Sequence, residues 1–144
     1  PWLTLCVLIC EALARQDPVA SLVRAIAPNL VVALLMDGPQ LKARWAARYA
    51  SVLADDPGSS VLTLTSVGMA ELSRSAGYKE KCRTVALWHD ARTPGPREIE
   101  LETGAEGIVL SVAIEQREEF TADGRSDDGQ SGYPILAGVH QVLV

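Results

Sequence analysis

Three short apolar runs, separated by segments with helical spacing, constrain most strongly how this chain can fold. Leu3–Ile9 and Leu30–Met36 are continuous runs, whereas in the third, Ser60–Ser66, Thr63 and Thr65 share one face and Leu62 and Leu64 share the other. Short apolar runs of this kind, bounded by turn residues, are typical of strands in the interior of a sheet. Because a helical pattern separates each pair of runs, the order strand–helix–strand predicts parallel crossover connections. The first half of the chain therefore predicts an α/β fold.

The two intervening segments carry helix signals. Asp17 is predicted as an N-cap, with Pro18 at the first helical position. The second segment runs from Gln40 to about Ala54, and its apolar stripe includes Trp45 and Tyr49. These two aromatic residues are interpreted first as core or interface residues rather than as substrate contacts.

The rest of the chain predicts strands that are close in sequence and therefore antiparallel. Glu71–Lys81 is polar and is predicted to be a loop. An acidic, glycine-bearing stretch at 115–132 is predicted to be an exposed loop or linker. The predicted division is a unit over residues 1–114, followed by a linker and apolar tail over 115–144. The predicted late strands are Thr84–Trp88, Arg97–Glu102 and Gly107–Ile114, and the apolar tail is Tyr133–Val144.

Composition excludes several classes of protein. The chain has 144 residues, 48% of them hydrophobic, which suits one ordinary globular domain. A net charge of −5 argues against general binding to nucleic acid or to anionic membranes. The first apolar run is too short to span a bilayer. Three cysteines do not make a disulfide framework, so a reducing, cytoplasmic location is expected. Because the chain lacks an initiator methionine and enters a core-like strand at once, we expect it to be a piece of a longer protein.

Cys10 ends the first apolar run, and Glu11 follows it. A nucleophilic cysteine must be accessible, ionised and close to hydrogen-bond donors, and the end of a buried strand offers the first of these. The glycines that usually flank a sharp nucleophile turn are absent. The interval to Arg15 is one residue short of a phosphate-binding cysteine loop, and Glu11 would repel a phosphate. A buried packing cysteine explains the position equally well on local sequence alone.

The other titratable residues give weaker indications. Cys6 and Cys10 are four apart on a strand, and Cys82, His89 and His140 are scattered, so no metal site is predicted. No cofactor motif is present either. His89-Asp90 resembles a catalytic pair, but it follows a strand in a Pro/Gly-rich stretch and is interpreted as a surface turn.

The elements follow one another in a characteristic order: "VLICEAL", then a helix, "NLVVALLMDG", a helix with "WAARYA", and "SSVLTLTSVGM". This order resembles the nitrilase-like carbon–nitrogen hydrolase superfamily from its nucleophile onward. The resemblance covers roughly residues 3–114. It implies a partial αββα sandwich, that is, a mixed sheet with helices on one face.

This resemblance implies a Glu–Lys–Cys mechanism acting on a small-molecule amide or nitrile. Cys10 is the expected nucleophile, and the backbone N–H of Glu11 is expected to contribute to the oxyanion hole. Met36, Asp37 and Gly38 are expected beside the substrate pocket. The family's glutamate and lysine precede the cysteine by many tens of residues, so neither stands in its usual place here, and the chain alone is expected to be inactive.

Two further expectations follow. Relatives commonly pair through helices near the cysteine, which predicts a homo-oligomer formed through the helix with Trp45 and Tyr49. The aromatic residue that usually follows the cysteine is absent here. The alternative is therefore a catalytically degenerate nitrilase-like domain that serves as a binding or assembly module in a larger protein.

Overall fold

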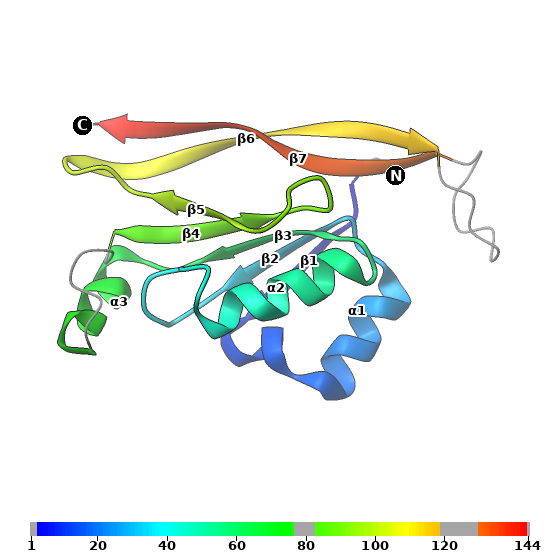
Figure 1. The fold of residues 1–144 in the computed structure, drawn as a ribbon, viewed down its shortest axis with the longest axis horizontal. Helices are drawn as coiled ribbons and strands as arrows, with labels where there is room; N and C mark the ends of the chain where they lie inside the picture. The colour runs from blue at the N-terminus through cyan, green and yellow to red at the C-terminus, as the bar shows by residue number, and fades with distance from the viewer. Residues whose placement is uncertain (1–2, 77–82, 119–129, 144) are drawn as a thin grey trace.

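A five-stranded mixed sheet forms the centre of the molecule (Figure 1). The computed structural model describes residues 3–76, 83–118 and 130–143. The strand order is β1-β2-β3-β4-β5; the first three strands are parallel, and the last two join antiparallel. The strands are β1 (Leu5–Ile9), β2 (Leu30–Leu34), β3 (Ser60–Leu64), β4 (Thr84–His89) and β5 (Arg97–Glu100).

Helices α1 and α2 cover one face of this sheet (Figure 1). The larger core lies between these helices and the sheet, where Val31, Ala33 and Val61 of the strands contact Ala50 and Leu53 of α2. Short helical turns follow β1 and β3. The helical elements are η1 (Cys10–Ala14), η2 (Gln16–Ala20), α1 (Ser21–Ile26), α2 (Trp45–Asp55), α3 (Val67–Leu72) and η3 (Ser73–Ala76).

A long antiparallel hairpin, β6 (Ala105–Glu118) and β7 (Gln130–Leu143), covers part of the opposite face (Figure 1). Trp88 of β4 is buried in the second core, on which partly buried hairpin side chains pack. The Ser60 hydroxyl also donates to the Pro134 carbonyl oxygen at 2.5 Å. The hairpin is therefore anchored by apolar packing and by polar contacts to the sheet.

The hairpin leaves β1, one of the two edge strands of the sheet, uncovered on that face. Val7 pairs with Val32, and Ile9 pairs with Leu34, so these side chains form apolar rows across the strands. Val7 is 51% exposed and Ile9 is 66% exposed, whereas Leu8, which points to the helices, is 7% exposed. One face of β1 is thus core and the other is a solvent-exposed apolar surface.

The structure confirms the coarse predictions. The fold is α/β, with a mixed sheet and helices α1 and α2 on one face. The first three apolar runs are parallel neighbours, and the later strands pair antiparallel, as expected. No helix within the described residues is long and apolar enough to cross a membrane. The division of the chain at residue 114 stays a prediction.

Several local predictions were wrong. The helix expected from Gln40 begins at Trp45, because Gln40 and Leu41 are buried in a loop instead. Glu71 and Leu72 were expected to lie in a loop, but they belong to α3. Ser66 caps this helix by accepting the Met69 N–H at 3.2 Å. Asp17 has the extended backbone of an N-cap, and helical residues follow from Pro18 as predicted, but α1 has no side-chain cap hydrogen bond. The loop expected over 115–132 has strand at both described ends, and the apolar tail pairs with β6. Residues 77–82 lie outside the described part.

Candidate active site

Cys10 has a backbone conformation that is unusual for its residue type. It follows the last residue of β1 with a φ of 50°, in the left-handed region that disfavours side chains with a Cβ. Among the described non-glycine residues only Ala27 shares a positive φ, and Ala27 ends α1, where that conformation is a common helix terminator. Cys10 instead begins a helical turn. Strain without such a local cause is typical of functional positions.

The two described cysteines differ in environment. Cys6 lies four residues earlier in the same strand and packs against the buried cluster under the helices. Burial raises the pKa of the Cys6 thiol, which disfavours its reactive thiolate form. Cys10 is half-buried and stands outside that cluster, at the point where the chain leaves the sheet. Cys6, within β1, is thus a packing thiol, whereas Cys10, directly after β1, lies at the edge of the sheet.

The turns after β2 and β3 lie at the same edge of the sheet as Cys10. Ile9 pairs with Leu34, and Leu34 pairs with Leu64, so the three parallel strands end level with one another. Ligands of open α/β sheets bind outside these carboxyl ends. This register supports a candidate site formed by the Cys10 turn and the turn that carries Met36, Asp37 and Gly38, with Met36 72% exposed.

Asp37 is the most heavily hydrogen-bonded side chain at this edge. Its Oδ1 accepts from the Gly38 backbone N–H and from Arg44 Nη2, each at 2.7 Å. Its Oδ2 accepts from the Trp45 indole Nε1, also at 2.7 Å. The Thr65 hydroxyl donates to the Asp37 carbonyl oxygen at 2.6 Å. Because both carboxylate oxygens already accept N–H donors, Asp37 organises the turn and is poorly placed to serve as a base.

The rest of this turn is packed as closely. A Cβ added at Gly38 would lie 2.5 Å from Arg44 Nη1 and 2.8 Å from the Ser73 Oγ, so the position requires glycine unless those side chains move. Gln40 is 1% exposed; its Nε2 donates to the Gly38 carbonyl at 3.0 Å, and its Oε1 accepts from the Thr63 hydroxyl at 2.8 Å. The loop from β2 to α2 is therefore a satisfied polar network rather than a flexible connection.

Glu11 contributes its backbone rather than its side chain to the Cys10 turn. Its carboxylate forms an exposed ion pair with Arg15 at 3.0 Å. The N–H groups in the first turn of a helix lack intrahelical acceptors, and Glu11 is the second residue of η1. Its N–H therefore has no acceptor within η1.

His89 and Asp90 do not form a surface turn, and the prediction that they do was wrong. They are 8% and 5% exposed. Asp90 accepts from Trp88 Nε1 at 2.8 Å and from the backbone N–H groups of Arg92 and Thr93 at 2.9 and 3.1 Å, which is a structural turn role. Burial lowers the pKa of His89, against the opposing effect of Asp55 and Asp90.

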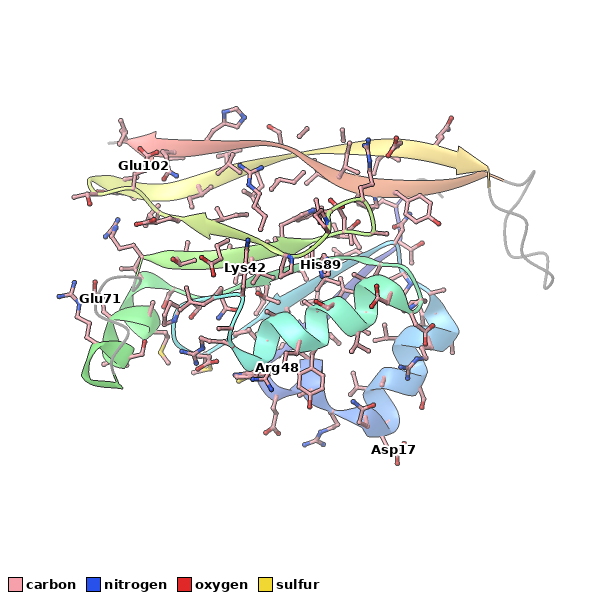
Figure 2. All side chains as sticks on the ribbon, viewed as in Figure 1. Asp17, Lys42, Arg48, Glu71, His89 and Glu102 are labelled. Atoms are coloured by element: carbon pink, nitrogen blue, oxygen red, sulfur yellow. The ribbon has the colours of Figure 1, made fainter. Side chains whose placement is uncertain are left out.

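His89 is also remote from Cys10. His89 pairs with Val61, and Val61 pairs with Val31, which pairs with Cys6 rather than with the strand end. Figure 2 shows the same separation. Glu71 belongs to α3, which follows β3 at the edge of the sheet that carries Cys10, and His89 lies toward the other end of the sheet. A Cys10–His89 dyad is thereby excluded.

Trp45 and Tyr49 pack within the molecule. Their rings meet edge to face, with centroids 6.1 Å apart, and both lie against the main core cluster. This packing agrees with the core interpretation, while the oligomer through this helix stays a prediction. In the described part of the chain, no group of three or more His, Cys, Asp or Glu residues is arranged to hold a metal ion.

In comparisons with family models, with curated proteins and with solved structures, nothing matched this chain.

Sequence reasoning missed the residues that organise this edge. The position of Arg44 beside Lys42 and Arg48 predicts a solvated face, and this was wrong for Arg44, whose side chain is 14% exposed and pairs with Asp37. Gln40 and Thr65 were not assigned to the site, because a buried glutamine and a threonine at a strand end carry no motif. The sequence offered one indication of this network. Between a predicted strand and a predicted helix, the run from Asp37 to Trp45 contains a carboxylate acceptor, a cationic arginine and an indole donor.

Proposed function

We propose that Cys10 is the nucleophile of a carbon–nitrogen hydrolase of the nitrilase-like type, acting on a small non-peptide amide or nitrile. The observation that carries this proposal is the left-handed backbone of Cys10 at the end of a parallel strand. In other hydrolase folds a strained strand-to-helix turn likewise lifts a nucleophile out of the sheet. The αββα sandwich belongs to this proposal, with the described sheet as one of its two sheets.

The chemistry assigned to the chain is limited to the nucleophile and its donors. The Cys10 sulfur attacks the amide carbon, and its proton passes to a general base. The carbonyl oxygen becomes an oxyanion that accepts from the Glu11 N–H. The C–N bond then breaks as the base returns the proton to the leaving nitrogen, and water hydrolyses the thioester that remains. We propose that the glutamate base and the second oxyanion donor, a lysine, come from polypeptide other than these 144 residues.

The first prediction concerns thiol reactivity. Iodoacetamide at pH 7 should alkylate Cys10 at least about tenfold faster than Cys6, because Cys6, although also half-buried, packs against the core cluster and desolvation raises its pKa. Peptide mass spectrometry on the folded chain measures both rates in one sample. Equal rates would place Cys10 among ordinary packing thiols and remove the basis of the proposal.

A turnover assay tests the division of the triad. The 144-residue chain should release no ammonia from a panel of small amides, whereas a longer protein that contains this chain should release it and lose this activity on Cys10→Ser. Turnover by the 144 residues alone would contradict the assignment of base and lysine to other polypeptide. An inactive longer protein with a reactive Cys10 would favour the second candidate function.

That second candidate is a degenerate nitrilase-like domain used for binding or assembly. The exposed apolar face of β1, where Leu5 is 53%, Val7 is 51% and Ile9 is 66% exposed, favours it. Contiguous apolar surfaces of this kind mark interaction sites in soluble proteins. In this case Cys10→Ser would leave the function of the longer protein intact, while polar substitutions on the β1 face would abolish it.

A further inference from the structure

The Asp37 network reaches the Cys10 turn through helix α2. The Asp37 carboxylate binds Arg44 and Trp45, which are the N-cap and first residue of α2. The Arg44–Asp37 pair is mostly buried, with side chains 14% and 25% exposed. A buried carboxylate that accepts three N–H donors is held much more firmly than a surface ion pair. The start of α2 is thereby fixed relative to the end of β2.

Helix α2 in turn contacts η1, the turn that begins with Cys10. Leu13 of η1 is 5% exposed and belongs to the same buried cluster as Ala46 and Ala50 of α2. Ala12 and Trp45 both pack against that cluster. A displacement of the first turn of α2 would therefore be transmitted to the residues that directly follow Cys10.

Asp37 also ties the neighbouring strand to this arrangement. Thr65, which follows β3, donates to the Asp37 carbonyl oxygen at 2.6 Å, and the Leu35 N–H donates to the Leu64 carbonyl at 2.8 Å. Two strand ends and one helix start thus converge on a single residue.

We infer that Asp37 is a positioning residue for Cys10: it fixes the start of α2, and through α2 it fixes the η1 turn that holds the Cys10 sulfur and the Glu11 N–H. This inference rests on the proposed function, since it assigns Asp37 to the same site. Asp37 itself does not transfer a proton, because both carboxylate oxygens are occupied by donors.

The test compares alkylation of Cys10 and Cys6 by iodoacetamide across variants of the full chain. Asp37→Asn replaces one acceptor oxygen with an NH2 group, which would oppose another N–H donor. We expect the Cys10 rate to fall about threefold while the Cys6 rate stays the same, because displacement of the η1 turn changes the access of the reagent to the Cys10 sulfur. The ratio of the two rates then decreases but stays above one. Asp37→Glu keeps the charge and should restore part of the ratio.

Asp56→Asn is the matched control. Asp56 caps the other end of α2 and pairs with Arg24 at 2.7 Å, but this pair is exposed, with side chains 65% and 41% exposed. Loss of this pair should leave the ratio unchanged. If Asp37→Asn and Asp56→Asn behave alike, Asp37 has no positioning role.

The ratio also separates positioning from loss of fold. Unfolding would expose both thiols, raise the Cys6 rate and bring the ratio close to one. If Asp37→Asn unfolds, Trp45→Phe tests the inference instead: it removes the indole donor but keeps an aromatic ring on the core, and it should lower the Cys10 rate while the Cys6 rate stays the same. An unchanged ratio in Trp45→Phe and in any folded Asp37→Asn would overturn the inference while the proposed function stands. A ratio near one in the unsubstituted chain would instead overturn the proposed function.

Discussion

His89 shows how a single residue makes the stability of this chain depend on pH. Its side chain is 8% exposed, its Nδ1 is buried with no hydrogen-bond partner, and burial is the main cause that lowers its pKa. Asp55 at the end of α2 and Asp90 next in sequence oppose this effect. The folded protein therefore holds a neutral imidazole, whereas the unfolded chain titrates near the ordinary histidine value, about 6.5.

This difference predicts acid sensitivity. Because the unfolded state binds the proton more readily, the free energy of unfolding is retained above pH 6.5 and falls as the pH decreases below it, by at most about 1.4 kcal/mol per pH unit for one proton. His89→Gln should flatten this slope in urea titrations at pH 7.0, 6.0 and 5.5. The exposed His140→Gln variant should keep it; a steep slope in both variants would assign the acid sensitivity to carboxylates.

At the scale of elements, one buried polar pair ties the connection from β2 to α2 to strand β3. Gln40 accepts from Thr63 at 2.8 Å and donates to the Gly38 carbonyl at 3.0 Å. Gln40→Met would leave the buried Thr63 hydroxyl without this acceptor, so we expect a loss of about 1–3 kcal/mol in the free energy of unfolding.

A double-mutant cycle checks this expectation. Adding Thr63→Val to Gln40→Met removes the hydroxyl as well, and the double variant should recover part of the loss in urea denaturation. Additive losses in the cycle would mean that the two side chains are not coupled, and that packing alone holds the loop.

The strands were predictable from sequence, but this loop was not. The sequence pattern located β1, β2 and β3 to within two residues at each end. This was possible because the residues that indicate a strand are adjacent in the sequence. The start of α2 was misplaced because the partner of Gln40 lies 23 residues away, on the next strand. Leu41, the residue after Gln40, is likewise buried in the loop.

The candidate site was predictable in part for the same reason. The sequence located Cys10 at a strand end, but it carried no indication of the left-handed backbone, since no glycine stands there. The Asp37 network depends on Arg44, Trp45 and Thr65 meeting across two turns, and this convergence follows from the strand register rather than from any local motif.

At the scale of the whole molecule, helices cover one face of the sheet and the hairpin covers part of the other. The helices bury Leu8 and Val31, whereas the hairpin packs over β4 and β5 and leaves β1 exposed. Adjacent residues of one strand thus have opposite energetic roles: Leu8 stabilises the core, and Val7 and Ile9 contribute a surface that water covers.

Substitution by threonine on the two faces of β1 separates these roles. Val7→Thr with Ile9→Thr keeps β-branched residues in the strand, so the free energy of unfolding should change by no more than about 0.5 kcal/mol per site. The same pair should reduce concentration-dependent association, because an exposed apolar patch of this kind drives self-association. Leu8→Thr, one residue away, should instead cost about 2–4 kcal/mol, since it replaces a buried methyl-bearing side chain with a smaller polar one. Urea denaturation measures the first and third effects, and sedimentation velocity across a hundredfold range of concentration measures the second. If Val7→Thr with Ile9→Thr destabilises the chain as strongly as Leu8→Thr does, the outer face of β1 is buried in solution and the apolar surface does not exist as described.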